Sequence, residues 1–394
     1  MTIGILGGGQ LGYMLALAGY PLGLHFRFFD PSPEAPVGRI ASRVTAEFTD
    51  ESALEKFANG LELVTYEFEN VPVAAARFLA QRVPVFPPPA ALETAQDRLR
   101  EKHLFQELGI PATEFAPVTD AEALDAAVEK IGLPAVLKTC RMGYDGKGQW
   151  TLRSSEDVAR AKSEIGGSAG ARLDPAAVPP GEAPFILERF VPFTRELSVL
   201  AVRSRTGETA VYPLVENHHR SGILRLSLAP APHLDPKIQY AAEDAARRVS
   251  ESLHYVGVLA IEFFERDGCL LANEMAPRVH NSGHWTIEGA FISQFENHLR
   301  AVMGLPLGST GAIGSSAMLN LIGEAPDSAE VLAIRDAHLH LYGKSPRPGR
   351  KLGHVTLRAG SPEQLASRLA ELPGFFHRPE FCLDRALSPA SSRA

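Results

Sequence analysis

Two apolar runs that flank an Asp-Gly pair place the strongest constraint on the fold of this chain. Val258–Phe264 and Cys269–Met275 are rich in β-branched, leucine and aromatic residues, which favour strands. Asp267-Gly268 between them is a typical hairpin connection, because both residue types tolerate the positive φ angles that tight hairpin turns require. This stretch therefore predicts two neighbouring antiparallel strands.

Each of the two predicted strands carries one glutamate, Glu262 and Glu274. A three-residue loop places these glutamates opposite each other on one face, whereas a two-residue loop pairs Glu262 with Asn273. We expect the three-residue loop. Like charges that oppose each other on a sheet repel, and in a run this apolar the repulsion indicates a shared divalent cation. A solvated face that carries both glutamates is the alternative interpretation.

The N-terminus predicts a parallel α/β unit. The strand Thr2–Leu6 is followed by the G-x-G-x-x-G turn Gly7–Gly12, a helix over Leu11–Gly19 and a second strand, Phe26–Phe29. Such a turn binds dinucleotide phosphates in Rossmann folds, with an acidic residue, here Asp30, on a ribose hydroxyl. A tight strand-to-helix turn that binds no dinucleotide fits the motif equally well.

The alternation of helices and strands continues to residue 86. Helices are expected over Glu51–Ala58 and Val73–Ala80, and strands over Leu61–Tyr66 and Val83–Phe86. Glu67, Glu69 and Asn70 follow the third strand, at the carboxyl edge where open α/β sheets bind ligands. Pro87-Pro88-Pro89 then ends the pattern and marks a domain boundary or a stiff linker.

A second glycine-rich loop follows a strand that contains a lysine. Lys138 lies within the apolar strand Ala135–Cys140, where a charge needs a partner or a ligand. The loop Gly143–Gly148 includes Lys147 and precedes a strand over Gln149–Arg153. Backbone amides and a lysine in such a loop suit the phosphates of a nucleotide, although a plain hairpin tip has the same composition.

The rest of the chain predicts mixed helices and strands around one basic cluster. The expected strands are Phe185–Phe190, Glu196–Ser204, Thr209–Val215, Ser316–Ile322 and His338–Tyr342, and the expected helices are Asp97–Leu108, Ala121–Ile131, Ser154–Ile165, Lys237–Leu253, Phe291–Val302 and Ser328–Arg335. Gly166–Ala183 is expected to be a surface loop, and Glu216–His219 a polar connecting run. The segment Lys344–Lys351 holds four basic residues, which suit a phosphate monoester or a solvated loop.

Composition narrows the function classes. The 394 residues are enough for two or three domains, and a net charge of −7 gives no electrostatic footprint for nucleic acid. Cys140, Cys269 and Cys382 lack C-x-x-C spacing, which argues against a disulfide framework or structural zinc and fits a reducing cytosol. No apolar run reaches membrane-spanning length, so we expect a cytoplasmic protein without membrane contact.

Five motifs in order along the chain resemble those of the ATP-grasp superfamily and, within it, the 5-(carboxyamino)imidazole ribonucleotide synthases of purine biosynthesis. They are Gly7–Gly12, Tyr66–Asn70, Gly143–Gly148, Asn273–Thr286 and Arg347–Lys351. The run A-P-R-V-H-N-S-G-H-W-T within Asn273–Thr286 is highly specific, and the resemblance covers essentially the whole chain.

The resemblance implies a mixed α/β and α+β fold, with an ATP-grasp core, an N-terminal Rossmann-like parallel α/β domain and a small C-terminal β-rich subdomain. The implied boundaries are 1–96 for the N-terminal domain, 97–190 for the small or lid domain, 191–310 for the large domain with the metal site, 311–385 for the part that completes it, and 386–394 for a flexible tail. A homodimer is also implied.

The implied activity is an ATP-dependent carbon–nitrogen ligation. Bicarbonate is activated by phosphoryl transfer to carboxyphosphate and then carboxylates the amine of 5-aminoimidazole ribonucleotide. Two Mg2+ ions held by Glu262 and Glu274 would bridge the phosphates of ATP. Other ATP-grasp ligases, such as formate-dependent glycinamide ribonucleotide transformylase, are the near alternative, and an NAD-dependent oxidoreductase is the distant one.

The resemblance also assigns roles to individual residues. ATP would contact Arg98, Lys138, Gly143, Tyr144, Asp145, Gly146, Lys147, Gly148, Glu188, Val191, Glu196, His219, Asn273 and Glu274. Catalysis would rest on Arg278, His280, Asn281, Tyr144 and Asp145. The ribonucleotide would contact Gln10, Leu11 and Glu69 through its ribose, and Lys344, Arg350 and Lys351 through its phosphate.

Overall fold

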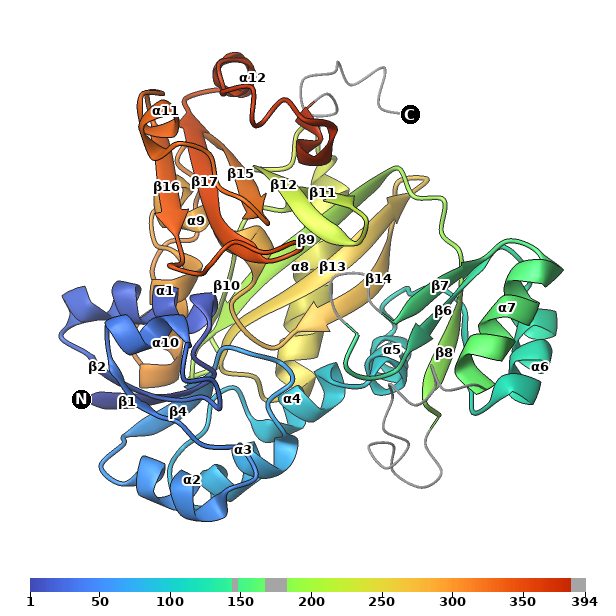
Figure 1. Cartoon of the computed structure of the whole chain (residues 1–394), viewed down its shortest axis with the longest axis horizontal. Coiled ribbons are helices and arrows are strands. Elements are labelled where there is room, and N and C mark those ends of the chain that lie inside the picture. The colour runs from blue at the N-terminus through green and yellow to red at the C-terminus, as the bar shows by residue number, and fades with distance from the viewer. Residues whose placement is uncertain (144–147, 167–182, 384–394) are drawn as a thin grey trace.

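The computed structural model describes residues 1–143, 148–166 and 183–383. The predictions for Tyr144, Asp145, Gly146 and Lys147, for most of the Gly166–Ala183 loop and for the C-terminal tail concern residues outside these ranges. Three sheets organise the described chain (Figure 1).

The N-terminal sheet is parallel, as the helix–strand alternation predicts. Its strands are β1 (Thr2–Leu6), β2 (His25–Phe29), β3 (Ser42–Val44) and β4 (Leu63–Tyr66), in the order β3-β2-β1-β4. The helices in this part of the chain are α1 (Gln10–Gly19), α2 (Glu51–Ala58) and α3 (Val73–Ala80).

The strand expected over Val83–Phe86 is wrong. Only one parallel bridge forms there, between Val64 and Val85. Pro84 interrupts the run, and a proline has no N–H to donate to a ladder. Pro89 is also more than a linker residue, because it begins α4 (Pro89–Ala95), which is followed by α5 (Arg98–Glu107).

The small sheet is antiparallel and has its own core. Its strands are β5 (Phe115–Val118), β6 (Ala135–Thr139), β7 (Gln149–Leu152) and β8 (Phe185–Arg189), in the order β5-β8-β6-β7. α6 (Ala121–Ile131) and α7 (Ser155–Gly166) pack on it and share a cluster of buried apolar side chains with the strands. Figure 1 shows this unit to one side of the molecule.

The large sheet joins the middle and the end of the chain. Its order is β14-β13-β9-β11-β12-β15-β17-β16, with β10 paired to β9. The strands are β9 (Arg195–Arg203), β10 (Thr209–Val211), β11 (Val215–Arg220), β12 (Ile223–Ala229), β13 (Gly257–Arg266), β14 (Cys269–Ala276), β15 (Ser315–Ile322), β16 (Ala337–Leu341) and β17 (Lys351–Ala359). Its helices are α8 (Pro236–Ser252), α9 (Thr286–Gly289), α10 (Gln294–Met303), α11 (Ser328–Leu332) and α12 (Pro362–Ala370).

Three strands of this sheet were not predicted from the sequence: β11, β12 and β17. The polar run Glu216–His219 lies in β11, and β12 follows it. The run is buried because its polar groups pair inside the sheet: Asn217 Nδ2 donates to Ser198 Oγ at 2.9 Å, and Ser227 Oγ donates to Asn217 Oδ1 at 2.8 Å. A strand whose inward face is polar lacks the apolar alternation that identifies strands in a sequence.

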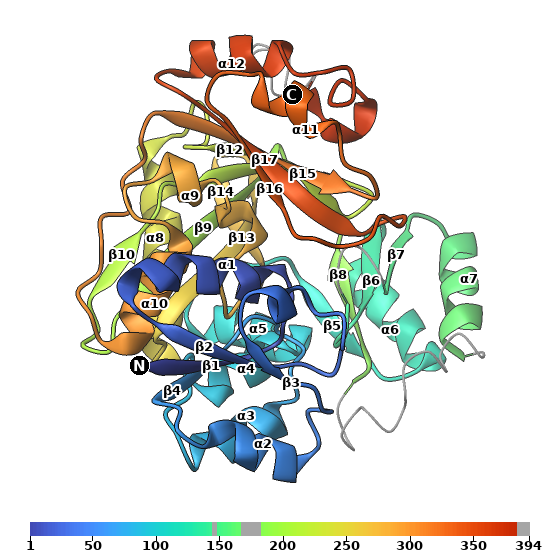
Figure 2. The ribbon, with the colours of Figure 1, turned by 60° about the vertical axis from the view of Figure 1, so that its left-hand side comes forward.

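The N-terminal unit packs directly on the large sheet. Side chains of α1 and α10 share one buried cluster with β9 and β13, which includes Leu15, Leu299 and Val258. Figure 2 shows α1 and α10 side by side, with the N-terminal sheet beneath them. The carboxyl edge of β4 therefore faces the same interior space as the β13–β14 hairpin.

In the β13–β14 hairpin, Glu262 and Glu274 face each other as expected, but for a different structural reason. Arg266 pairs with Cys269, so the loop has two residues, and Asp267 and Gly268 have φ of 53° and 72°. The three-residue loop predicted from the sequence is therefore wrong. Glu262 nevertheless opposes Glu274, because a β-bulge between Glu262 and Phe263 shifts the register. Asn273 is the extra residue of that bulge.

Candidate active site

One cavity of about 970 Å3 lies where the three sheets meet. It is lined by residues from every sequence motif singled out above. The lining includes the predicted site residues Gln10, Leu11, Glu69, Arg98, Lys138, Gly143, Glu188, Val191, Glu196, His219, Glu262, Asn273, Glu274, Arg278, His280, Asn281, Lys344 and Lys351. Gly148 and Arg350 are described but are not part of this lining.

The two hairpin glutamates differ strongly in acidity. Burial and the charge of Glu274 raise the pKa of Glu262 to about 7. Burial alone would also raise the pKa of Glu274, but Arg98, whose Nη1 lies 2.8 Å from Glu274 Oε2, helps hold it at about 2. The pair therefore carries one firmly ionised carboxylate, Glu274, and one, Glu262, whose ionised form is disfavoured by burial and by the facing Glu274. His280 Nε2 lies 3.6 Å from Glu262 Oε1.

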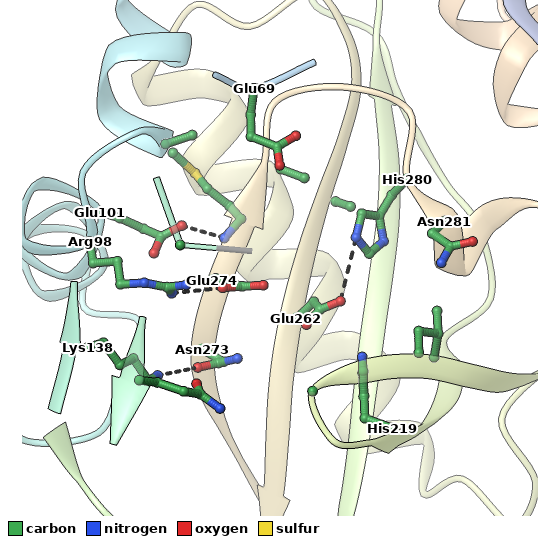
Figure 3. Close-up of a pocket in the computed structure, with 18 of the residues that line it drawn as sticks. Glu69, Arg98, Glu101, Lys138, His219, Glu262, Asn273, Glu274, His280 and Asn281 are labelled. Carbon is green, nitrogen blue, oxygen red and sulfur yellow. Dashed lines mark hydrogen bonds and ion pairs between the residues drawn. The ribbon is translucent and has the colours of Figure 1, made fainter. Parts of the chain in front are cut away.

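Cations line the wall next to the hairpin. Lys138 Nζ lies 2.8 Å from Glu188 Oε2 and 3.4 Å from Asn273 Oδ1 (Figure 3). These contacts are the partners that a lysine in an apolar strand needs. Burial would raise the pKa of Glu188, but Lys102 and Lys138 lower it to about 2. Glu188 thus binds lysines, whereas the resemblance places it beside adenine and ribose.

A histidine–glutamate pair lies beside Glu262. His219 of β11 and Glu196 of β9 are joined by a 2.5 Å contact between Nδ1 and Oε2. Burial would lower the pKa of His219, but Glu196 and the nearby hairpin glutamates raise it to about 9. His219 is therefore a cation at neutral pH, on the opposite side of Glu262 from Arg98 (Figure 3).

The segment after β14 supplies polar groups of a different kind. Arg278 binds Glu69 at the edge of β4 through a charged hydrogen bond. The side-chain Nδ2 and Oδ1 of Asn281 are buried, and among the described residues neither has a hydrogen-bond partner. Buried polar atoms without partners are costly, so this amide suits a polar ligand.

His280 is neutral and has a defined orientation. Burial, then the charge of Arg278, lowers its pKa to about 3. Its Nδ1 lies 2.8 Å from Ser282 Oγ, and Ser282 Oγ in turn accepts from Ser198 Oγ at 2.8 Å. Ser282 therefore donates to Nδ1, which leaves the proton of the imidazole on Nε2, facing Glu262.

The basic cluster meets the glycine-rich turn across the cavity. Lys344 Nζ lies 2.5 Å from Gln10 Oε1, and burial lowers the pKa of Lys344 to about 8. Arg347 and Lys351 also line the cavity. Arg350 instead donates to the carbonyl of Ser345 at 3.3 Å.

The G-x-G-x-x-G turn has its amides filled by the protein's own carboxylates. Glu67 accepts from Gly9 N–H at 2.9 Å and from Gly12 N–H at 3.1 Å, and Asp30 Oδ2 accepts from Gly8 N–H at 2.6 Å. A methyl group added to Gly9 would lie 2.9 Å from Glu67 Oε1, so the glycine is needed for this close approach. Because Glu67 occupies the position that a dinucleotide phosphate takes in a Rossmann site, the motif here is a structural turn.

Sequence reasoning missed two residues that line this cavity, Arg347 and Glu101, and one that lies behind it, Lys102. Arg347 was part of the basic cluster but was not assigned to a ligand, and Glu101 and Lys102 had no signal beyond their place on a helix. Glu101 and Lys102 are almost fully buried, with 2% and 0% of their surface exposed.

Comparisons with known proteins cover the whole architecture. The ribonucleotide synthetase preATP-grasp domain matches residues 1–96, the ATP-grasp domain residues 103–295, and the phosphoribosylaminoimidazole carboxylase C-terminal domain residues 316–368. These matches and the similar solved structures confirm the predicted fold class.

Relatives and solved structures that match almost the whole chain carry the same family name. The N5-carboxyaminoimidazole ribonucleotide synthase of Pseudomonas aeruginosa is 54% identical over 94% of this chain and 98% of its own, and that of Brucella melitensis is 47% identical over 90% and 95%. The Thermus thermophilus synthetase structure is 60% identical, with a TM-score of 0.86 over 94% of this chain and 97% of its own. An Aspergillus clavatus synthase with ADP and 5-aminoimidazole ribonucleotide is 30% identical, with a TM-score of 0.84 over 98% of both chains. The chain belongs to the N5-carboxyaminoimidazole ribonucleotide synthase family of ATP-grasp ligases.

Proposed function

We propose that this protein carboxylates 5-aminoimidazole ribonucleotide with bicarbonate, at the expense of ATP, to give N5-carboxyaminoimidazole ribonucleotide, ADP and phosphate. One observation carries the proposal. A single cavity is lined both by the Glu262/Glu274 pair with its cationic neighbours and by three residues of the basic cluster, Lys344, Arg347 and Lys351. The cavity is thus suited to two phosphorylated ligands at once.

The hairpin carboxylates fit Mg2+. Mg2+ in phosphoryl-transfer sites is commonly held by one or two carboxylates, with water and phosphate oxygens completing its shell. The described part of the chain has no group of three or more acidic, histidine or cysteine side chains that could hold a metal, but it has this pair. Burial and the facing Glu274 raise the pKa of Glu262, and a divalent ion bound there would offset the repulsion between the two carboxylates and neutralise phosphate oxygens. We propose two such ions, held by Glu262 and Glu274.

ATP would lie along the wall formed by α5, the small sheet and β11. Arg98 and Lys138 point into the cavity and would contact phosphate oxygens, with Gly143–Gly148 covering them. Lys138 would have to share its charge between Glu188 and the nucleotide, because its bond to Glu188 is 2.8 Å long. Val191, Glu196 and His219 would hold the nucleoside end.

Bicarbonate would lie by Arg278, His280 and Asn281. One bicarbonate oxygen attacks the γ-phosphorus, the new O–P bond replaces the bond to the β-phosphate oxygen, and ADP leaves. The amine nitrogen then forms a bond to the carboxyl carbon and displaces phosphate, and its proton must be removed. Arg278 would stabilise the negative charge, and the departing phosphate would take the amine proton. His280, which is neutral with its proton on Nε2, would shuttle a proton by giving up this one as Nδ1 gains one from Ser282.

The ribonucleotide would occupy the end of the cavity near β4 and the basic cluster. Gln10, Leu11 and Glu69 would contact its ribose, and Lys344 and Lys351 its phosphate. Arg347, which lines the cavity, is a better candidate for the phosphate than Arg350, which does not. The roles of Tyr144 and Asp145 at the imidazole stay predictions.

Two broader expectations complete the proposal. We propose a homodimer, to be checked by light scattering, and a cytoplasmic location, which the cysteine pattern favours. Within the described residues, no helix has the length and apolar character needed to cross a bilayer.

An ADP-release assay across candidate acceptors tests the activity. We expect release that requires 5-aminoimidazole ribonucleotide and bicarbonate together, with little release when glycinamide ribonucleotide and formate replace them. ADP release that ignores the imidazole nucleotide and responds to glycinamide ribonucleotide with formate would contradict the proposal. Tight NAD binding without binding of ATP and Mg2+ would also contradict it, and the filled amides of Gly9 and Gly12 argue against that outcome.

A further inference from the structure

The hairpin that carries the two glutamates ends at the edge of the large sheet. β14 is the terminal strand of the sheet, and among the described residues the outer side of its backbone meets no further strand, only an isolated parallel bridge between Ala112 and Ala272. Buried N–H and C=O groups need partners, and an uncovered edge exposes a row of them. The Ala272 N–H finds Pro111 O at 2.7 Å, and helix α5 covers the next groups along the strand.

Lys102 of α5 binds the β-bulge from behind. Its Nζ donates to Ala272 O at 3.1 Å and to Asn273 O at 2.8 Å, and lies 3.7 Å from Glu188 Oε2. The residue is 0% exposed, and it does not belong to the described lining of the cavity. Burying an ammonium group is costly unless it is fully bonded, so these carbonyls are part of what keeps Lys102 charged inside the protein.

Glu101, the neighbouring residue on α5, binds the other side of the bulge. Its Oε1 accepts from Met275 N–H at 2.5 Å (Figure 3). Glu101 is 2% exposed, and burial together with the charge of Glu274 raises the pKa of its carboxyl group to about 8. The bonds to Ala272, Asn273 and Met275 therefore bracket Glu274 on both sides along the strand.

We propose that Lys102 and Glu101 are positioning residues that hold the bulge and thereby aim Glu274 at Glu262. The two-residue turn by itself would pair Glu262 with Asn273 and direct Glu274 to the other face of the sheet. The extra residue in β14 reverses this, and bulges beside active sites commonly redirect a side chain in this way. The inference rests on the metal role proposed for Glu262 and Glu274.

Mn2+ binding in the presence of ADP tests the inference without turnover. Lys102→Met keeps a long unbranched side chain, one heavy atom shorter, and removes the charge and the donors. We expect the Mn2+ dissociation constant, followed by electron paramagnetic resonance of the free ion, to rise by about 10-fold or more, as when a group that orients a metal ligand is lost. The Mg2+ concentration for half-maximal ADP release should rise as well, and kcat should recover at high Mg2+.

Two further variants separate positioning from general destabilisation. Glu101→Met removes the acceptor for Met275 N–H and should weaken Mn2+ binding in the same way. Phe105→Leu, a change in the buried core face of the same helix, should lower the thermal midpoint while leaving Mn2+ affinity unchanged.

Wild-type Mn2+ affinity in folded Lys102→Met and Glu101→Met would overturn the inference. If one variant does not fold, the other decides by the same measurement, and failure of both to fold would assign these residues to the whole fold and not to the bulge. If the wild-type protein with ADP binds no Mn2+, the proposed metal site itself fails, which is a distinct result.

Discussion

The glycine-rich turn at Gly7–Gly12 and the hairpin that carries Glu262 and Glu274 both have sequences typical of sites for charged ligands. In the turn, Glu67 and Asp30 already satisfy the amides that would bind a phosphate. In the hairpin, two carboxylates face each other, and burial together with this repulsion raises the pKa of Glu262 to about 7. A motif is therefore a candidate ligand site where the fold does not already satisfy its groups, and these two regions illustrate the two cases.

The largest effect is expected at the unsatisfied region. Glu274→Gln keeps the side-chain volume and removes the charge that pairs with Arg98 and that the proposed metal ion would require. We expect ADP release to fall by at least about 100-fold, since loss of a ligand should cost no less than loss of a group that orients one. Circular dichroism should show an intact fold. Near-normal release at ordinary Mg2+ would remove the metal role from this residue.

A change in the Gly7–Gly12 turn, whose amides are already bonded to Glu67 and Asp30, should affect the stability of the protein. Glu67→Ala leaves the N–H groups of Gly9 and Gly12 without their acceptor, at a cost of about 3 kcal/mol in the free energy of unfolding measured with urea. The vacated space should then behave as an anion site, so added formate should raise the stability of the variant and not of the wild type. Equal responses of both proteins to formate would show that Glu67 does not fill that site.

In the metal-free protein, the burial of Glu262 and its repulsion by Glu274 should make the free energy of unfolding depend on pH. The pKa of Glu262 is raised to about 7, so its carboxylate costs stability progressively as pH rises from its unfolded value of 4.5 through 7. With a chelator present, Glu262→Gln should gain stability relative to the wild type across that window, by about 1–3 kcal/mol at its upper end. A difference that does not change with pH would contradict the raised pKa.

The turn of the hairpin should matter least. Gly268 has φ of 72°, and a methyl group added there meets no atom within 4 Å, so Gly268→Ala adds only backbone strain. We expect a loss of about 1 kcal/mol in stability, measured with urea, and unchanged Mg2+-dependent ADP release. A change in Mg2+ dependence would show that the turn, and not the bulge, aligns Glu262 with Glu274.

The sequence was sufficient where chain-local patterns decide the structure. The parallel N-terminal unit, the β13–β14 hairpin and the fold class followed from strand and helix periodicity and from motif resemblance, and family comparison confirms the fold class. The prediction from the sequence was wrong where residues far apart in the chain determine the local structure. The alignment of Glu262 with Glu274 comes from a bulge held by α5, more than a hundred and fifty residues earlier, and not from the loop length that we expected.

Polar interiors were the other source of error. Glu216 to His219 form a buried strand, because Ser198 and Ser227 satisfy Asn217 from the neighbouring strands. Lys102 was also missed, because the carbonyl oxygens that bond its buried ammonium group lie 170 and 171 residues away along the chain. The roles of the lining residues stay predictions until variants are measured.

The most direct measurement of the central claim is Mn2+ binding to the protein with ADP, compared between the wild type and the double variant Glu262→Gln, Glu274→Gln. The account predicts saturable Mn2+ binding in the wild type and its loss in a double variant that is folded, because both facing carboxylates have been replaced. Undiminished Mn2+ binding in the double variant would contradict the claim that this hairpin is the metal site.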